Sequence, residues 1–237
     1  MKKIDIFGLT LCALFANAQD WRFVNQAIPD GSFSGLQSTI DYVQSDLPPD
    51  HIDVSLSLRP GAGGAFVGDL FAMLVHGDSF HDPHAVILIN RPGRDNGRVF
   101  GYSDVIDVSV TFTTVTGANG DFHNYRQILT GNQSTPLAGP LTGLWEADGR
   151  AVSPLDVLAN SPRNTALSDF SSMDPNGKWT LFIADVSKGG NWNLLGWKVA
   201  VVPEPEEYAA VTCFVLFASG VLLRRRRTVQ KPGRATG

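Results

Sequence analysis

Two stretches of this chain alternate apolar and polar residues without interruption, and they constrain its fold more than any other feature. They are Ile52–Leu58 and Ile106–Phe112, where every second residue is Ile, Val, Leu or Phe. Successive side chains of a β-strand point to opposite faces, so this period of two predicts strands with one buried and one wet face. Clusters of Gly, Pro, Asn and Asp separate the other short apolar runs. This pattern is typical of an all-β sandwich or barrel.

The same pattern predicts several short strands and very little helix. The run from Ala85 to Ile89 is apolar throughout, which predicts a strand that is covered on both faces. One short helical turn is expected at Thr165–Phe170. The predicted strands are Trp21–Gln26, Ile52–Leu58, Leu70–Val75, Ala85–Asn90, Ile106–Thr113, Trp179–Ala184 and Leu194–Val201.

The first 18 residues have the order of parts of a secretory signal peptide. Lys2 and Lys3 form a positive start, Ile6–Phe15 is a short apolar segment, and Ala16-Asn17-Ala18 is an A-x-A cleavage site. We therefore expect the Sec translocon to export the chain. Cleavage after Ala18 would leave an exported domain at residues 19–201.

The end of the chain carries a second signature of export. Pro203-Glu204-Pro205 precedes an apolar run from Tyr208 to Leu223, and the run is followed by Arg224, Arg225, Arg226 and Arg227. A helix of roughly 16 residues is ~24 Å long and can cross a bilayer core of ~30 Å that thins slightly. Because arginines are retained on the cytoplasmic side, residues 228–237 are expected to form a cytoplasmic tail.

This order of parts, at residues 202–227, resembles the PEP-CTERM sorting signal of Gram-negative bacteria. The resemblance implies that an exosortase in the inner membrane recognises and cuts the segment. It also implies release of the protein to the cell surface or to the extracellular polysaccharide. A plain C-terminal anchor is the alternative interpretation.

Removing both ends changes what the composition means. The cysteines are Cys12 and Cys213, so the exported domain has none and must depend on a hydrophobic core rather than on disulfides. Of the 19 Lys and Arg residues, 8 lie in the terminal segments, and of the 23 Asp and Glu residues, 4 do. The exported domain therefore carries a formal charge near −8, which excludes nucleic acid as a partner because its recognition needs a basic surface.

Residues 52–201 carry two further motifs. Gly68-Asp69-Leu70 stands at the entry to a predicted strand, and Trp179 and Trp197 lie in two runs joined by Gly189-Gly190. A glycine turn between two such runs predicts that they pair as antiparallel strands. Together the motifs resemble the P domain that accompanies subtilisin-like proprotein convertases. That resemblance implies a jelly-roll β-sandwich, which in convertases stabilises a neighbouring catalytic domain.

Histidines and carboxylates gather in one loop and raise the question of a metal. They are His76, His81 and His84, with Asp78 and Asp82 between them. Imidazole and carboxylate groups bind zinc, but this spacing matches no zinc motif and a loop with a proline does not orient ligands. A solvated loop is the favoured interpretation, and the metal remains unknown.

Other candidate sites have an ordinary structural interpretation beside the functional one. Asn119–Asp121 reads as a tight turn with calcium as the minor alternative, and Asp185 as a turn cap or an ion ligand. Trp179 and Trp197 could stack on sugars, but large aromatic residues on strands are more often core. Gly61–Phe66 lacks the third glycine of a dinucleotide fingerprint and is expected to be a turn.

No motif predicts catalysis. Gly31–Gly35 is not a nucleophile elbow. Glu146 is the one glutamate of the exported domain, so a glycosidase would need a pair of aspartates or an aspartate together with Glu146. The expected function is therefore an exported, exosortase-processed, non-enzymatic surface or matrix protein with a structural or adhesive role. A carbohydrate- or calcium-binding module and a secreted hydrolase are the alternatives.

Overall fold

The computed structural model describes residues 21–43, 49–77, 84–171 and 173–203. The expected signal peptide at 1–18, the apolar span at 208–223 and the tail at 228–237 lie outside this part of the chain. Within the described ranges, no helix is long and apolar enough to cross a bilayer. The chain divides into two compact units between Val202 and Pro203. The strands lie in the first unit, except that the last strand extends one residue beyond it, to Pro203.

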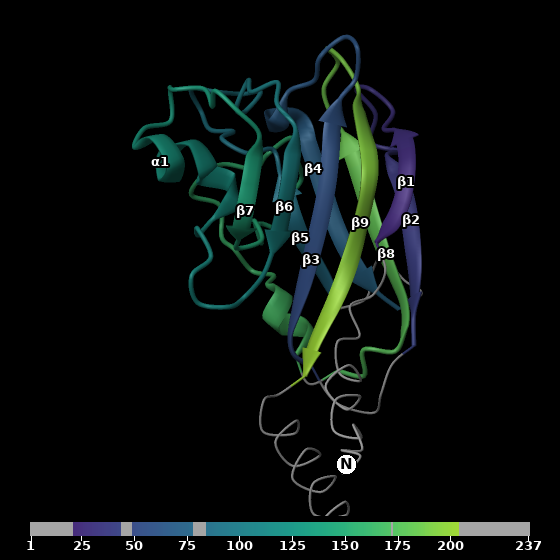
Figure 1. Ribbon diagram of the computed structural model, residues 1–237. Helices are drawn as coiled ribbons and strands as arrows, with labels where there is room; N and C mark the ends of the chain where they lie inside the picture. Colours follow the sequence, from purple (N-terminus) through teal and green to yellow (C-terminus); the bar gives the residue numbers. More distant parts are fainter. Residues whose placement is uncertain (1–20, 44–48, 78–83, 172, 204–237) are drawn as a thin grey trace, which may run out of the picture. The chain divides into compact units, whose positions relative to one another are not determined.

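The described residues form two β-sheets, as the alternating pattern predicts (Figure 1). One sheet has five strands in the order β1-β9-β3-β6-β7, and the other has four in the order β2-β8-β4-β5. The strands are β1 (Arg22–Ala27), β2 (Leu36–Tyr42), β3 (Pro49–Pro60), β4 (Leu70–His76), β5 (Ala85–Asn90), β6 (Val108–Phe112), β7 (Leu141–Trp145), β8 (Gly177–Asp185) and β9 (Trp192–Pro203). Strands β6 and β7 run parallel. The other strand pairs whose register is known are antiparallel.

The core lies between the sheets and follows the predicted alternation. In β3 the side chains of Val54, Leu56 and Leu58 are buried, and in β6 Val108, Val110 and Phe112 are buried in register with them. Residues from both sheets belong to one continuous apolar cluster. The two sheets also share a polar contact, because the Trp197 indole N–H donates to the Ser38 hydroxyl oxygen at 2.9 Å. Apolar burial between the sheets therefore provides the main driving force for folding.

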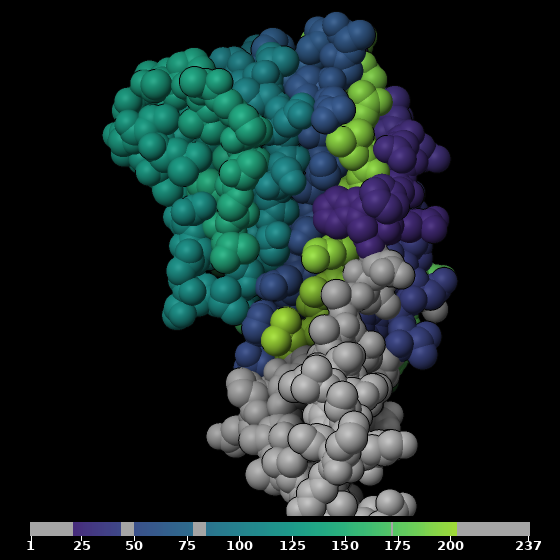
Figure 2. Space-filling model, in the orientation of Figure 1, coloured from purple at the N-terminus to yellow at the C-terminus, as the bar shows by residue number. Residues whose placement is uncertain are grey.

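Strand β5 is covered as its continuous apolar sequence predicts. Residues 86–90 are all buried although β5 lies at an edge of its sheet. The backbone N–H groups of Asp148 and Gly149 donate to Leu88 and Ile87 along this edge, so a loop satisfies carbonyls that would otherwise face solvent. By contrast, β1 is largely exposed, and Figure 2 shows it on the surface beside β9.

The structure corrects the predicted pairing of the strands around Gly189-Gly190. β8 lies in the four-stranded sheet and β9 in the five-stranded sheet, so the two strands do not form a hairpin. The connection at residues 186–191 instead crosses from one sheet to the other. Gly190 has a φ of 128°, and a Cβ there would lie 1.8 Å from the Gly64 carbonyl oxygen. The glycine therefore permits close packing of two loops rather than a tight hairpin turn.

Several elements were not predicted. Strands β2 and β7 have mixed sequences, and helix α1 (Tyr125–Thr130) follows a 3₁₀ turn, η2 (Phe122–Asn124), that the Asp121 side chain caps. The prediction that Thr165–Phe170 is the one helical segment was therefore wrong. A second 3₁₀ turn, η1 (Val67–Asp69), leads into β4, while the expected turn is present as η3 (Leu167–Phe170). A single helical turn is too short to show a helical period in the sequence.

We expect Trp179→Ala to lower the free energy of unfolding by about 3 to 5 kcal/mol, because it would leave a large cavity in the core. Trp179 is 1 % exposed, its indole N–H donates to the Pro175 carbonyl, and its ring packs edge-on against Phe170. Urea denaturation measures the change. The matched control is Phe23→Ala, since Phe23 is 72 % exposed, and equal effects of the two variants would contradict a core role for Trp179.

Candidate functional site

Two buried aspartates lie side by side at one end of the sandwich. Asp69 ends η1 immediately before β4, and Asp185 is the last residue of β8. They are neighbours because Leu70 pairs with Asp185 and the Val186 N–H donates to the Asp69 carbonyl at 2.8 Å. Asp69 is 4 % exposed and Asp185 is 1 % exposed. A carboxylate this deeply buried needs a nearby positive charge or hydrogen-bond donors, or else its pKa rises.

The glycine of the Gly68-Asp69-Leu70 motif brings a third loop against these aspartates. The Gly68 N–H donates to the Tyr102 carbonyl at 2.8 Å. A Cβ on Gly68 would lie 2.4 Å from the Phe100 carbonyl oxygen, so only glycine permits this approach without movement of the backbone. The motif thus positions the loop of residues 98–104 beside Asp69.

Arg91 provides the positive charge of the cluster. Its guanidinium donates to the Gly68 carbonyl at 3.2 Å, to an Asp69 carboxylate oxygen at 3.4 Å and to the Ser187 hydroxyl at 2.9 Å. The residue has a φ of 47°, a left-handed conformation that is unfavourable for a non-glycine residue. Such strain is found most often at functional sites, which makes this end of the sandwich a candidate.

The carboxylate of Asp185 is less well compensated than that of Asp69, because no side chain of the described residues donates a hydrogen bond to it. A hydrogen bond from the Ser187 backbone and the charge of Arg91 favour its ionised form, while the charges of Asp69 and Asp30 oppose it. Burial raises the pKa of Asp185 to about 7, and the negative charge of Asp69 adds to the rise. Burial also raises the pKa of Asp69, although Ser187 and Arg91 oppose this effect, and it lowers the pKa of Arg91.

A pocket of about 330 Å³ opens beside Asp69. This volume lies at the lower end of the range of ~300–1,000 Å³ that is usual for ligand sites. Two of its aromatic side chains face solvent, Phe66 at 38 % and Phe100 at 69 % exposure. The lining residues are Phe66, Asp69, Phe100, Gly101, Tyr102, Ser103, Ser187 and Lys188. An apolar wall with a few polar groups is the usual composition of a binding pocket.

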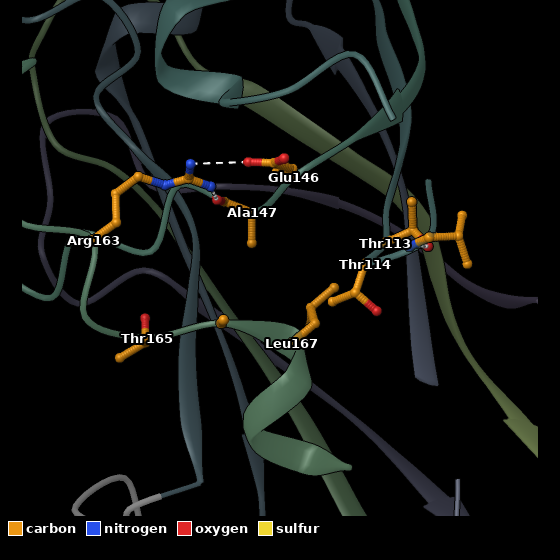
Figure 3. Close-up of a pocket in the computed structure, with 9 residues that line it drawn as sticks. Thr113, Thr114, Glu146, Ala147, Arg163, Thr165 and Leu167 are labelled. Carbon is orange, nitrogen blue, oxygen red and sulfur yellow. Dashed lines mark hydrogen bonds and ion pairs between the residues drawn. The ribbon is translucent and has the colours of Figure 1, made fainter. Parts of the chain in front are cut away.

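A second pocket is smaller and its charged groups are already paired (Figure 3). Its volume is about 190 Å³. Figure 3 shows the ion pair of Arg163 and Glu146 on one side, with Thr165 and Leu167 on the other. Arg163 also donates to the Asp148 and Ala147 carbonyls, at 3.0 and 2.8 Å. We therefore rank this pocket below the one at Asp69.

A buried charge network that the sequence did not reveal connects the long loops. The His123 ring places Nδ1 3.0 Å from an Asp148 carboxylate oxygen and 3.1 Å from the Asn90 carbonyl, while Nε2 lies 3.2 Å from the Arg94 carbonyl. Both ring nitrogens thus lie within hydrogen-bond distance of oxygen atoms, which fixes the orientation of the ring. Arg150 binds Asp148 and Asp121, with N–O distances of 3.1 and 2.7 Å. No spacing in the sequence marks this network, because its members are brought together by loops.

The structure places the predicted site residues in different surroundings. Of the histidine loop, His81, Asp78 and Asp82 lie outside the described residues, and His76 packs on Trp179 with its Nε2 3.1 Å from the Asn176 carbonyl. The described residues hold no group of three His, Cys, Asp or Glu side chains that could bind a metal. Trp179 and Trp197 are core, as the favoured interpretation predicted.

Two other expectations are refined. Asp121 binds Arg150 and caps η2, so the calcium alternative at Asn119–Asp121 loses its carboxylate to an arginine. Gly61–Phe66 is a loop between β3 and η1, as expected. The cleavage-site residues Ala16 and Ala18 lie outside the described part of the chain, as do Glu204, Pro205 and Arg224 to Arg227. Pro203 is the last residue of β9.

Comparison of this chain with known protein families, with curated proteins and with solved structures finds no match. The resemblances to a sorting signal and to a P domain therefore rest only on the sequence motifs described above. The structure by itself shows an all-β sandwich of two sheets.

We expect the free energy of unfolding of the Asp185→Asn variant to increase, relative to that of the wild type, as pH rises from 4 to 7. Burial raises the pKa of Asp185 from its ordinary value of 3.8 to about 7 in the folded protein. Between these values an unfolded chain ionises while the folded chain stays protonated, so the wild type loses stability as pH rises. Urea denaturation of both proteins at pH 4.5 and 7.5 measures the difference. A difference that is independent of pH would contradict the shifted pKa.

We expect Asp148→Ala to cost about 3 to 5 kcal/mol, because it removes one of the two carboxylates that pair with the buried Arg150 and the carboxylate that contacts the buried His123. Glu146→Ala is the matched control, since it removes the exposed ion pair with Arg163 and should cost about 1 kcal/mol or less. Both effects are measured by denaturant unfolding at neutral pH. Equal costs would show that the buried network contributes no more than a surface pair.

Proposed function

We propose that this chain is an exported, exosortase-processed protein of a Gram-negative cell envelope or extracellular polymer, with a structural or adhesive and non-enzymatic role. The observation that carries this proposal is the order Pro203-Glu204-Pro205, apolar run 208–223, Arg224 to Arg227. The signal at residues 1–18 supports it independently, because a C-terminal sorting signal can act only on an exported chain.

The division of the chain supports the proposed processing. The last strand ends at Pro203, the first residue of the Pro-Glu-Pro motif, and the compact unit of the sandwich ends at Val202. Cutting the chain after this point would remove no described strand from the core. A released domain would therefore keep its sheets.

The strand order supports a jelly-roll arrangement of the two sheets, which is the fold that the resemblance to P domains implies. When β7 is set aside, the strands pair in a nested sequence: β1 with β9, β2 with β8, β3 with β6 and β4 with β5. A long hairpin of four such pairs, rolled so that it forms two sheets, is a jelly roll. Gly68 at the entry to β4 and the tryptophans of β8 and β9 are the further features by which we relate it to P domains.

Burial of the His123–Asp148 pair supports a non-enzymatic role over a secreted hydrolase. Both side chains are fully buried and their polar atoms are bound to other groups. A catalytic base must reach the substrate, directly or through one water molecule. This pair is therefore placed to stabilise loops rather than to move a proton to or from a substrate.

The pocket at Asp69 favours a carbohydrate-binding role as the second candidate. Exposed aromatic rings at the mouth of a pocket can pack against the C–H face of a sugar, and serine hydroxyls such as Ser103 and Ser187 can bind its hydroxyl groups. Calcium is less well supported there, because the Arg91 guanidinium occupies one side of Asp69. Binding of extracellular polysaccharide would be consistent with an adhesive role.

We expect replacement of Pro203-Glu204-Pro205 by three alanines to block exosortase cleavage and to trap an uncut form in the membrane. A plain anchor needs only an apolar span and a positive cytoplasmic end, so the change would leave its retention unaltered. The intact mass of the mature protein, in a host with and without an exosortase, separates the two. Retention of the C-terminus by the wild type in the exosortase host would refute the proposed sorting signal.

A further inference from the structure

Strands β1, β7, β2 and β5 lie at the edges of the two sheets, and three of them are protected against pairing with another chain. The register of β1 is irregular, and its Asn25 has a φ of 51°. Loop N–H groups bind carbonyls along β5. On β7, the Asn119 N–H donates to the Leu144 carbonyl at 2.8 Å, and the Trp145 indole donates to the Thr142 carbonyl at 2.9 Å. Bulges and covering groups of this kind prevent association through sheet edges.

Strand β2 is the fourth edge strand, and it has none of these protections (Figure 1). It pairs with β8 without interruption, from Leu36 opposite Ile183 to Tyr42 opposite Gly177. Within the described ranges, no other strand pairs with it. Its sequence contains no proline, and Asp41 is its one charged residue. A regular strand with an open edge is a template for pairing with a further strand.

The hydrogen bonds around β8 show which backbone groups of β2 face this open edge. The Asp185 carbonyl accepts from the Ser32 N–H on the β2 side, whereas the Lys178 carbonyl accepts from the Gly77 N–H on the β4 side. Because alternate residues of a strand direct their backbone groups to the same edge, the odd-numbered residues of β8 bind β2. The residues of β2 opposite the even-numbered ones therefore direct their N–H and C=O groups away from β8. These outward-facing residues are Gln37, Thr39 and Asp41.

We propose that two copies of this chain form a dimer in which their β2 strands pair antiparallel about a two-fold axis at Thr39. The two four-stranded sheets then become one continuous sheet. Thr39 faces the Thr39 of the second copy, and Gln37 faces its Asp41. Every outward N–H of these residues meets an outward carbonyl, which makes the edge complementary to itself. This inference goes beyond the proposed function and does not depend on export or on the sorting signal.

Neighbouring registers satisfy fewer of these groups. A two-fold axis at Ser38 would leave the outward groups of Asp41 without a partner from the outward residues. An axis at Ile40 would do the same to Gln37. An axis at Asp41 would place two carboxylates directly opposite each other, which is destabilising. The axis at Thr39 is therefore the one that pairs all three outward residues.

The side chains favour the same register. Gln37 and Asp41 are exposed, and Thr39 is half-buried. The glutamine amide donates hydrogen bonds that a carboxylate accepts, and two threonines opposite each other form a favourable pair. Lys178 lies opposite Asp41 on β8, so the charge of Asp41 has a cation beside it within its own sheet. A second copy thus meets a locally balanced edge although the exported domain is acidic.

Single cysteines in the full chain test the register, after Cys12 and Cys213 are replaced by serine. Thr39→Cys would place two cysteines with Cα atoms about 5.5 Å apart, which a disulfide can span. We expect oxidation to link most of this variant into a covalent dimer, as seen on a non-reducing gel. Gln37→Cys and Asp41→Cys should link poorly alone and efficiently when mixed. Thr142→Cys, at an exposed position of the edge strand β7, is the matched control and should link poorly.

Charge variants test the same register through the dissociation constant of the dimer, measured by sedimentation equilibrium of the full chain in detergent. Gln37→Asp would place a carboxylate opposite Asp41 at two symmetric positions, so we expect association to weaken about tenfold. Adding Asp41→Gln exchanges the pair and should restore association. Thr142→Asp adds the same charge to β7 and should have no effect. Because these side chains are exposed or at a strand edge, circular dichroism should show an unchanged fold.

Three outcomes would overturn the inference. Equal linking of Thr39→Cys and Thr142→Cys would show that β2 does not pair with itself. Efficient linking of Gln37→Cys alone would place the two-fold axis elsewhere. Failure of the exchanged pair to restore association would show that Gln37 and Asp41 do not face each other. None of these results bears on the sorting signal, which is tested by cleavage.

Discussion

Apolar burial between two sheets is the interaction on which the described structure depends. The two cysteines of the chain lie at positions 12 and 213, so the sandwich itself contains none and no disulfide can restrict its unfolded state. Large side chains fill the interior instead, including four fully buried tryptophans: Trp145, Trp179, Trp192 and Trp197. Their indole N–H groups donate to hydroxyl or carbonyl oxygens, so each contributes apolar area without leaving a buried donor unpaired.

Buried charge pairs stabilise the long connections that the sheets cannot reach. His123, Asp148 and Arg150 join loops around β5, and the loop backbone covers the edge of that strand. Arg126 and Asp104 form a comparable pair, 2.7 Å apart, where α1 packs against the loop that follows β5. In each case a carboxylate has a cationic partner, which is the condition for retaining a buried charge. At Asp69 and Asp185 two carboxylates lie near one guanidinium, that of Arg91, and burial raises the pKa of both.

The site and the proposed export belong to different parts of the chain. The pocket is built by three connections: η1, the loop at 98–104 and the crossing at 186–191. The proposed sorting motif begins at Pro203, where the last strand ends. A domain released by cleavage would therefore retain its pocket, and binding of a polymer could follow release without any change in the sandwich.

The sequence by itself determined the class of fold and most of its strands. Strict alternation at Ile52–Leu58 and a continuous apolar run at Ala85–Ile89 predicted burial correctly, because strand periodicity is a local property. The export signals are also linear and could be read directly, and they stay predictions. Only the tertiary structure decided which strands pair. It separated β8 from β9, paired β1 with β9, and brought Asp69, Arg91 and Asp185 together. These contacts join residues far apart in the chain, and no local pattern records them because they arise from packing of the whole core.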